Sequence, residues 1–174
     1  MKKYYLLAVA IVALIVMASG CTTQTGNNTT TKTYSANGMT FNYPGNWTII
    51  NETTNENGTI IALGDADIQQ NNTLKGNGVS IIKIPKTANS SAELANLKSE
   101  FANLNGTNGT ISIAGVTANE TTFNSNVNNV TAQIKIIDFE KNNNLYLIQY
   151  ATISTTFQNQ QQLFDIITKS FQTQ

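Results

Sequence analysis

The sequence predicts an α+β domain in which a mostly antiparallel β-sheet carries helices packed on its faces. Apolar and polar residues alternate through most of residues 34–151, which is the pattern of strands with one buried face. Two segments, 91–104 and 157–171, instead space their apolar residues as one face of a helix does. A sheet interrupted by two helices in this way indicates an α+β sandwich.

Eight strands are expected, each a run rich in apolar or β-branched residues between turn residues. Their predicted ranges are 39–43, 47–50, 59–63, 79–84, 110–113, 116–123, 130–140 and 145–151. Pro44-Gly45 is expected to turn the chain after the first strand, with Gly45 supplying a positive φ. Residues 141–144 are expected to form the hairpin loop between the last two strands, because Asn tolerates a positive φ.

The first helix is expected to begin at a capping box in which Ser90 is the N-cap and Glu93 reaches back to it. Its apolar stripe would consist of Leu94, Leu97, Phe101 and Leu104. The second helix would bury Phe157, Leu163, Phe164, Ile167 and Phe171. Trp47 is expected to lie in one core with three other aromatic residues, Phe41, Phe101 and Phe171.

The N-terminal segment is expected to be an export signal and a tether. Two lysines precede the uncharged stretch 4–18, and Ser19-Gly20-Cys21 follows, as in a lipoprotein signal peptide. We predict a signal peptide at 1–20, a lipid on Cys21, a disordered polar tether at 21–32 and a folded domain at 33–174. An uncleaved anchor and a reactive thiol are the alternatives. The apolar stretch is shorter than the ~20 residues that span a bilayer, and no histidine is present to activate a thiol.

The composition argues against several classes of function. Lysine supplies every basic charge, arginine is absent, and removal of Lys2 and Lys3 with the signal would leave a net charge of −2. Such a surface gives no electrostatic reason to bind nucleic acid. The absence of histidine removes the usual general base and the usual zinc ligand. We therefore expect a protein that is not an enzyme, has no catalytic residues and needs no cofactor.

Asparagine is abundant and often begins an N-x-Ser/Thr sequon, a possible glycan acceptor on an exported chain. The sequon positions are Asn27, Asn28, Asn46, Asn51, Asn57, Asn71, Asn89, Asn105, Asn108, Asn119 and Asn129. A chain so rich in Asn and Thr also produces sequons by chance. Occupancy is expected if the source is an archaeon, which is our expectation for this chain.

One acidic segment is a weak candidate for binding Ca²⁺. Asp65 and Asp67 place two carboxylates at alternate positions, followed by amide side chains. Gln70 and Gly76 stand where an EF-hand loop has Gly and Glu, so we expect a solvated connection and no metal site. Ser80 and Lys83 match a Ser-x-x-Lys string, but a strand would place them on opposite faces.

Three segments resemble the PsbP-like family over residues 34–172. They are the opening MTFNYPGNW at 39–47, the strand at 145–151 after a tight hairpin, and the closing IITKSF at 166–171. The resemblance implies an antiparallel sheet with helices on its faces. The family includes an extrinsic subunit of the photosystem II oxygen-evolving complex and many secreted proteins or lipoproteins. No manganese- or photosystem-contacting residue can be matched to this chain.

These observations predict an exported, lipid-anchored protein on the outer face of the cell membrane. Its role would be non-catalytic, either binding a ligand or assisting a membrane or envelope complex. The alternatives are a glycosylated structural coat protein and a weak Ca²⁺-binding module. The expected partners are the membrane, through the lipid on Cys21, and a protein complex of the membrane or envelope.

Overall fold

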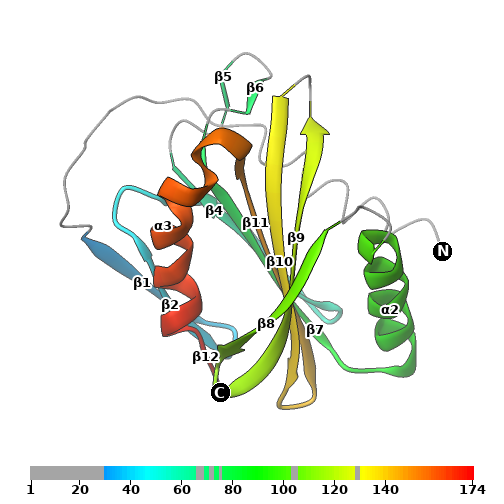
Figure 1. Cartoon of the computed structure of the whole chain (residues 1–174). Coiled ribbons are helices and arrows are strands. Elements are labelled where there is room, and N and C mark those ends of the chain that lie inside the picture. Colours follow the sequence, from blue (N-terminus) through cyan, green and yellow to red (C-terminus); the bar gives the residue numbers. More distant parts are fainter. Residues whose placement is uncertain (1–29, 66–68, 71–72, 75, 103–105, 128–129) are drawn as a thin grey trace.

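The computed structural model describes residues 30–65, 69–70, 73–74, 76–102, 106–127 and 130–174. Its centre is a seven-stranded sheet in the order β3-β4-β7-β11-β10-β9-β8 (Figure 1). The strands are β3 (Thr48–Asn55), β4 (Gly58–Gly64), β7 (Gly78–Pro85), β8 (Thr107–Ile113), β9 (Val116–Val127), β10 (Val130–Lys141) and β11 (Asn144–Ile153). Every neighbouring pair is antiparallel, which confirms the predicted α+β class.

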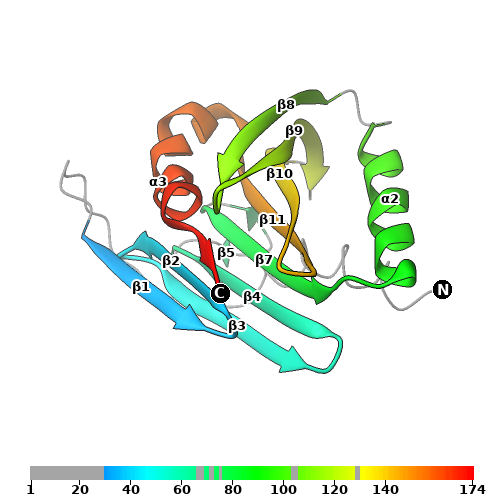
Figure 2. The same ribbon diagram turned by 90° about the horizontal axis from the view of Figure 1, so that it is seen from below.

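A smaller sheet and two helices complete the domain. The small sheet has the order β1-β2-β12, with β1 (Thr31–Ala36), β2 (Met39–Pro44) and β12 (Gln172–Thr173). The helices are α2 (Ala88–Ala102) and α3 (Phe157–Ser170), the latter preceded by the 3₁₀ turn η1 (Ser154–Thr156). β5 (Gln69–Gln70) and β6 (Thr73–Leu74) form a short separate ladder. The small sheet and α3 cover one face of the large sheet, and α2 stands on the other (Figure 2).

The main core lies between the large sheet, α3 and the small sheet. Trp47 and Phe41 are fully buried, and Phe171 is 2% exposed in the same cluster. The rings of Phe41 and Phe171 stack with their centroids 5.7 Å apart. The predicted burial of these three residues is confirmed, whereas the side chain of Phe101 lies outside what the structure describes.

The first strand was not predicted. β1 begins at Thr31, so the last two residues of the predicted tether, at positions 31 and 32, belong to the sheet. β1 pairs with β2 through a turn in which Asn37 and Gly38 have positive φ, 54° and 69°. The buried Tyr34 donates a hydrogen bond from its hydroxyl to Oε1 of Glu52, 2.8 Å away on β3. This bond links the small sheet to the large one.

The turn after β2 forms for a different reason from the one expected. The amide of Trp47 donates to the carbonyl of Pro44 at 2.9 Å, so Pro44 opens the turn. Gly45 does not have a positive φ. A Cβ atom at this position would lie only 2.7 Å from the carbonyl oxygen of Thr30, to which the Gly45 amide donates. Glycine is needed here for a close approach of two backbones, because any side chain would collide.

The capping box of α2 lies three residues before its predicted position. The amide of Ser90 donates to Oγ1 of Thr87 at 3.1 Å, and the amide of Thr87 donates back to Oγ of Ser90 at 2.8 Å. Thr87 is therefore the N-cap, and Ser90 takes the place that Glu or Gln usually fills. Leu94 is half-buried, and the side chains at 97, 101 and 104 lie outside the described part of the structure.

Candidate functional site between α2 and the large sheet

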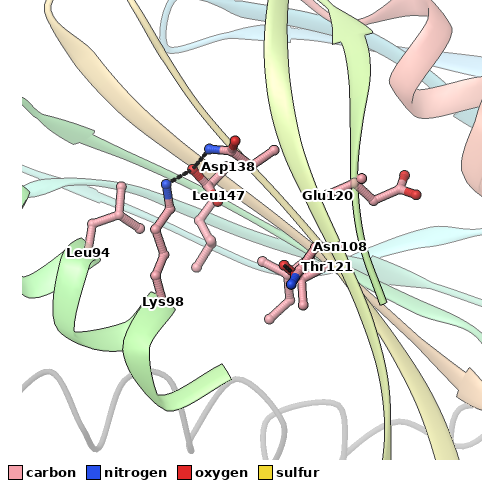
Figure 3. Close-up of a pocket in the computed structure, with 10 residues that line it drawn as sticks. Leu94, Lys98, Asn108, Glu120, Thr121, Asp138 and Leu147 are labelled. Carbon is pink, nitrogen blue, oxygen red and sulfur yellow. Dashed lines mark hydrogen bonds and ion pairs between the residues drawn. The ribbon is translucent and has the colours of Figure 1, made fainter. Parts of the chain in front are cut away.

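A pocket of about 290 Å³ lies between α2 and the face of the large sheet that α3 does not cover. Residues from α2 and from strands β8 to β11 line it: Leu94, Lys98, Asn108, Gly109, Asn119, Glu120, Thr121, Ile136, Asp138 and Leu147. In Figure 3, Leu94 and Lys98 reach from the helix towards the strands, where Asp138 and Leu147 face them. The pocket therefore needs both the helix and the sheet.

The floor of the pocket is apolar. Ile136 and Leu147 come from the neighbouring strands β10 and β11, and Leu94 faces them from α2. Ile136 is 3% exposed and belongs to a second, smaller hydrophobic cluster on this face of the sheet. Leu147 packs against that cluster while remaining half-buried. A ligand in the pocket would thus meet aliphatic carbon on the floor.

One wall of the pocket is an ion pair supported by an amide. Nζ of Lys98 lies 2.5 Å from Oδ2 of Asp138, and Nδ2 of Asn119 donates to the same oxygen at 3.0 Å. The Asp138 side chain is only 10% exposed, whereas that of Lys98 is 42% exposed. The carboxylate is held in place by two donors, because a buried charge is stable only when it is paired and hydrogen-bonded.

The opposite wall carries neutral polar groups. Oγ1 of Thr121 on β9 donates to Oδ1 of Asn108 on β8 at 2.9 Å, and both side chains project into the pocket (Figure 3). Glu120 points away from them. Its Oε2 lies 3.2 Å from Nζ of Lys135, which sits 5.8 Å from the ring centre of Phe157 on the α3 face. Glu120 is thus neutralised on the other side of the sheet.

The pocket presents balanced charge and mixed hydrogen-bonding groups. Its lysine and aspartate neutralise each other, and its amides and hydroxyl can both donate and accept. Within the residues that the structure describes, no group of three or more His, Cys, Asp or Glu side chains could hold a metal ion. The arrangement is suited to holding a small polar ligand against an aliphatic floor.

The sequence profile of the PsbP-like protein family matches residues 7–173. This chain belongs to the PsbP-like family. The match includes every element of the described fold, so the predicted resemblance is confirmed. No curated protein matches the sequence of this PsbP-like chain.

Solved structures share the fold of this PsbP-like domain at low sequence identity. CyanoP, a cyanobacterial PsbP from Synechocystis sp. PCC 6803, has 14% identity and a TM-score of 0.53, covering 89% of this chain and 98% of CyanoP. LpqN of Mycobacterium tuberculosis, described as involved in cell envelope biogenesis, has 12% identity and a TM-score of 0.54, with 84% and 91% covered. A Bacteroides thetaiotaomicron protein has 11% identity and a TM-score of 0.52 over 79% of this chain. The chain spans 45% of that protein.

Asp65, one of the two residues of the weak Ca²⁺ candidate, is hydrogen-bonded across the two ends of the segment that connects β4 to β7. Its Oδ2 accepts from Nδ2 of Asn77 at 2.9 Å, and the Asn77 amide lies 3.2 Å from each carboxylate oxygen. The hydroxyl of Tyr150 in turn donates to Oδ1 of Asn77 at 3.2 Å, and burial raises the pKa of Tyr150. Asp67 lies outside the described residues. The hydrogen bonds of Asp65 therefore hold the two ends of this connecting segment together.

Six sequon asparagines of the PsbP-like domain lie in its described part. Asn46, Asn57, Asn89, Asn108 and Asn119 are exposed, and Asn51 is half-buried. The remaining five, Asn27, Asn28, Asn71, Asn105 and Asn129, lie outside the described residues. Two of the exposed positions, Asn108 and Asn119, line the pocket. The sequence singled out these two only as sequons and did not bring them together.

Ser80 is buried on the α2 face of β7, whereas Nζ of Lys83 donates to the carbonyl of Asn37 on the opposite face, which confirms that the two are apart. The predicted signal peptide and Cys21 lie outside the described residues. Among the described helices, none is long and apolar enough to cross a bilayer.

Proposed function

We propose that this PsbP-like protein is exported, is anchored by a lipid on Cys21 to the outer face of the membrane, and serves a non-catalytic binding role in a membrane or envelope complex. The pocket between α2 and the sheet is the proposed binding site. The observation that carries this proposal is the built pocket, with its paired charges, amide groups and aliphatic floor.

The position of the pocket suits an anchored protein. The chain enters the domain at Thr31, the start of β1, and α2 stands at the opposite side of the molecule in both views (Figures 1 and 2). A tether that ends at β1 would leave the α2 side accessible to a ligand or partner. The family match begins at residue 7, inside the predicted signal peptide, which supports treating that segment as part of the family pattern.

The comparisons support an accessory role. LpqN, which shares the fold at 12% identity, is described as involved in cell envelope biogenesis. The family resemblance implies relatives that include an extrinsic subunit of a membrane complex. A domain that assists such a complex needs a binding surface and an anchor. The proposed lipid on Cys21 would supply the anchor.

The anchor is tested by intact-mass analysis of the membrane fraction. The expected mass lacks residues 1–20 and includes a lipid adduct on Cys21. Cys21→Ser should release the protein into the soluble fraction, because the lipid would be lost. Cys21 is the only cysteine, so the serine variant changes no other thiol. A mature mass that retains the apolar segment, or a serine variant that stays in the membrane, would contradict the proposal.

A glycosylated surface coat is the second candidate function. It is favoured by the five exposed sequon asparagines, which lie on β8, β9, α2 and two turns. Glycopeptide mass spectrometry of the protein from its own cell is the test. Glycans at most of these positions would favour the surface-coat function. Unmodified asparagines would contradict it and favour the binding function.

A further inference from the structure

We propose that the pocket between α2 and the sheet binds a neutral sugar. The inference deepens the proposed binding role and rests on it, but it does not depend on the anchor. It is drawn from four properties of the pocket: balanced charge, complementary hydrogen-bonding groups, an aliphatic floor and size.

The charge balance favours an uncharged ligand. Lys98 and Asp138 are 2.5 Å apart and neutralise each other. An anion bound to Lys98 would lie beside the Asp138 carboxylate and be repelled by it, and a cation bound to Asp138 would have to replace Lys98. Glu120 is directed to the other face, where Lys135 neutralises it. A neutral ligand can therefore bind without breaking an ion pair.

The polar side chains leave both donors and acceptors for such a ligand. In the contacts between described residues, Asn108 accepts through Oδ1, so its NH₂ group remains as a donor. Asn119 donates through Nδ2, so its carbonyl oxygen remains as an acceptor. Lys98 has three donors and directs one at Asp138. A sugar hydroxyl both donates and accepts, and several neighbouring hydroxyls match this mixed set.

The floor and the volume fit a single sugar ring. The C–H groups of a sugar ring can lie against Leu94, Ile136 and Leu147, while the hydroxyls at the ring edge reach the polar walls. The cavity of about 290 Å³ is near the lower end of the ~300–1,000 Å³ typical of ligand pockets. A long acyl chain would find too little apolar surface here, because three aliphatic side chains form the floor.

The sugar that occupies the pocket has two possible sources. One is a free saccharide of the cell envelope. The other is a glycan of the chain itself, because Asn108 and Asn119 are both sequon asparagines on the pocket wall. Residues Asn108 and Thr121 face each other across β8 and β9, so a glycan on Asn108 would begin at the pocket wall.

Sugar binding is tested on the full chain made in a bacterial host without N-glycosylation and kept in a detergent whose headgroup is not a sugar. Glucose, galactose, mannose and N-acetylglucosamine are titrated while the side-chain NH₂ signals of Asn108 and Asn119 are followed by NMR. At least one of these sugars should give saturable shifts at millimolar concentration. Glucuronate and glucosamine, which add one charge to the same ring, should bind more weakly than glucose.

Two pocket variants and one matched control test the location. Asn108→Ala and Asn119→Ala should each weaken binding about tenfold, equivalent to about 1.4 kcal/mol. Asn124→Ala changes an exposed asparagine on β9 that lies outside the pocket, so the affinity should be unchanged. Thermal unfolding of each variant shows whether the fold is retained. Should a pocket variant not fold, the shifts of the two NH₂ signals in the unmodified chain still locate the ligand.

The source is tested on protein from a glycosylating cell. Thr110→Ala removes the sequon of Asn108 without changing a pocket side chain. If the occupant is a glycan on Asn108, a free sugar should bind Thr110→Ala and not the glycosylated parent. If it is a free saccharide, both proteins should bind it equally.

The proposal would be overturned by the absence of saturable shifts with all four neutral sugars, by tighter binding of a charged sugar than of glucose, or by equal effects of Asn119→Ala and Asn124→Ala. A failure of the Cys21→Ser experiment would overturn the anchor alone. The titration is done in detergent without a membrane, so its result does not depend on the anchor and the two failures are distinguishable.

Discussion

Lys98 of α2 and Asp138 of β10 form the ion pair that joins the helix to the large sheet, with Nζ and Oδ2 2.5 Å apart. None of the described side chains of α2 is buried, whereas α3 buries Phe157, Phe164, Ile167 and Thr168. Because the side chain of Asp138 is only 10% exposed, we expect this pair to contribute more to stability than a surface ion pair usually does.

Lys98→Met should loosen α2. Among the described residues, the change leaves Asn119 as the remaining side-chain donor to Asp138, and a poorly satisfied buried polar group typically costs about 1–3 kcal/mol. Hydrogen exchange should become faster in α2 and stay slow in β10 and β11. Lys169→Met is the control, because Lys169 is 77% exposed in its pair with Asp165 and should cost less than about 1 kcal/mol. Equal destabilisation by the two variants would contradict the role of Lys98.

Trp47→Ala should be strongly destabilising. Trp47 is fully buried in the main core, and truncation of a large aromatic residue typically costs ~3–5 kcal/mol out of a total of ~5–15 kcal/mol. The midpoint of urea unfolding should fall accordingly. Ile49→Ala, two residues further along, is the control, since Ile49 is 37% exposed and its truncation should have a small effect. An unchanged midpoint for Trp47→Ala would show that the core is assigned incorrectly.

Calcium should leave the stability of the protein unchanged. The Asp65 oxygens already accept hydrogen bonds from Asn77, and bound Ca²⁺ at a hundredfold excess over its dissociation constant would add ~2.7 kcal/mol. The thermal midpoint should be equal in millimolar Ca²⁺ and in EDTA. Asp65→Asn should lower it in both buffers, because an amide has only one accepting oxygen. A rise with Ca²⁺ that is lost when Asp65 and Asp67 are both changed to Asn would establish a metal site.

The protein should lose stability above pH 10 through Tyr34. Burial, followed by the hydrogen bond to Glu52, raises the pKa of Tyr34 from 10.0 to about 12, although Asn37 opposes the shift. Between these two values the folded state binds more protons than the unfolded state, so stability is complete below pH 10 and decreases as pH rises towards 12.

This dependence is tested by measuring the midpoint of urea unfolding from below pH 10 up to about pH 12, the interval between the unfolded and folded pKa values of Tyr34. Tyr34→Phe should be less stable at neutral pH because the bond to Glu52 is lost, and its stability should fall less steeply above pH 10. If stability falls equally steeply with pH in the parent and in Tyr34→Phe, the loss of stability at alkaline pH is due to groups other than Tyr34.

Local patterns in the sequence predicted most of the fold, and they failed where the deciding signal was of another kind. β1 was missed because its residues are nearly all polar and exposed, with only Tyr34 buried. The Asn37-Gly38 pair was the available signal, since this dipeptide suits a tight hairpin turn. β3 was expected to end at residue 50 but runs to Asn55, because its outer half is an exposed edge that needs no apolar residues.

The sequence alone determined the alternation of strands, the position of α3, the Asn142-Asn143 hairpin turn and the burial of Trp47, because each depends on residues close together in the chain. Alternation also places Asn119 and Thr121 on one face of their strand. Only the tertiary structure brought that face under α2 and placed Lys98 against Asp138. The order of strands in a sheet and the side on which a helix packs depend on contacts between distant segments, which periodicity does not encode. The close approach of Gly45 to Thr30 was likewise decided by tertiary structure, because it depends on where a distant backbone passes.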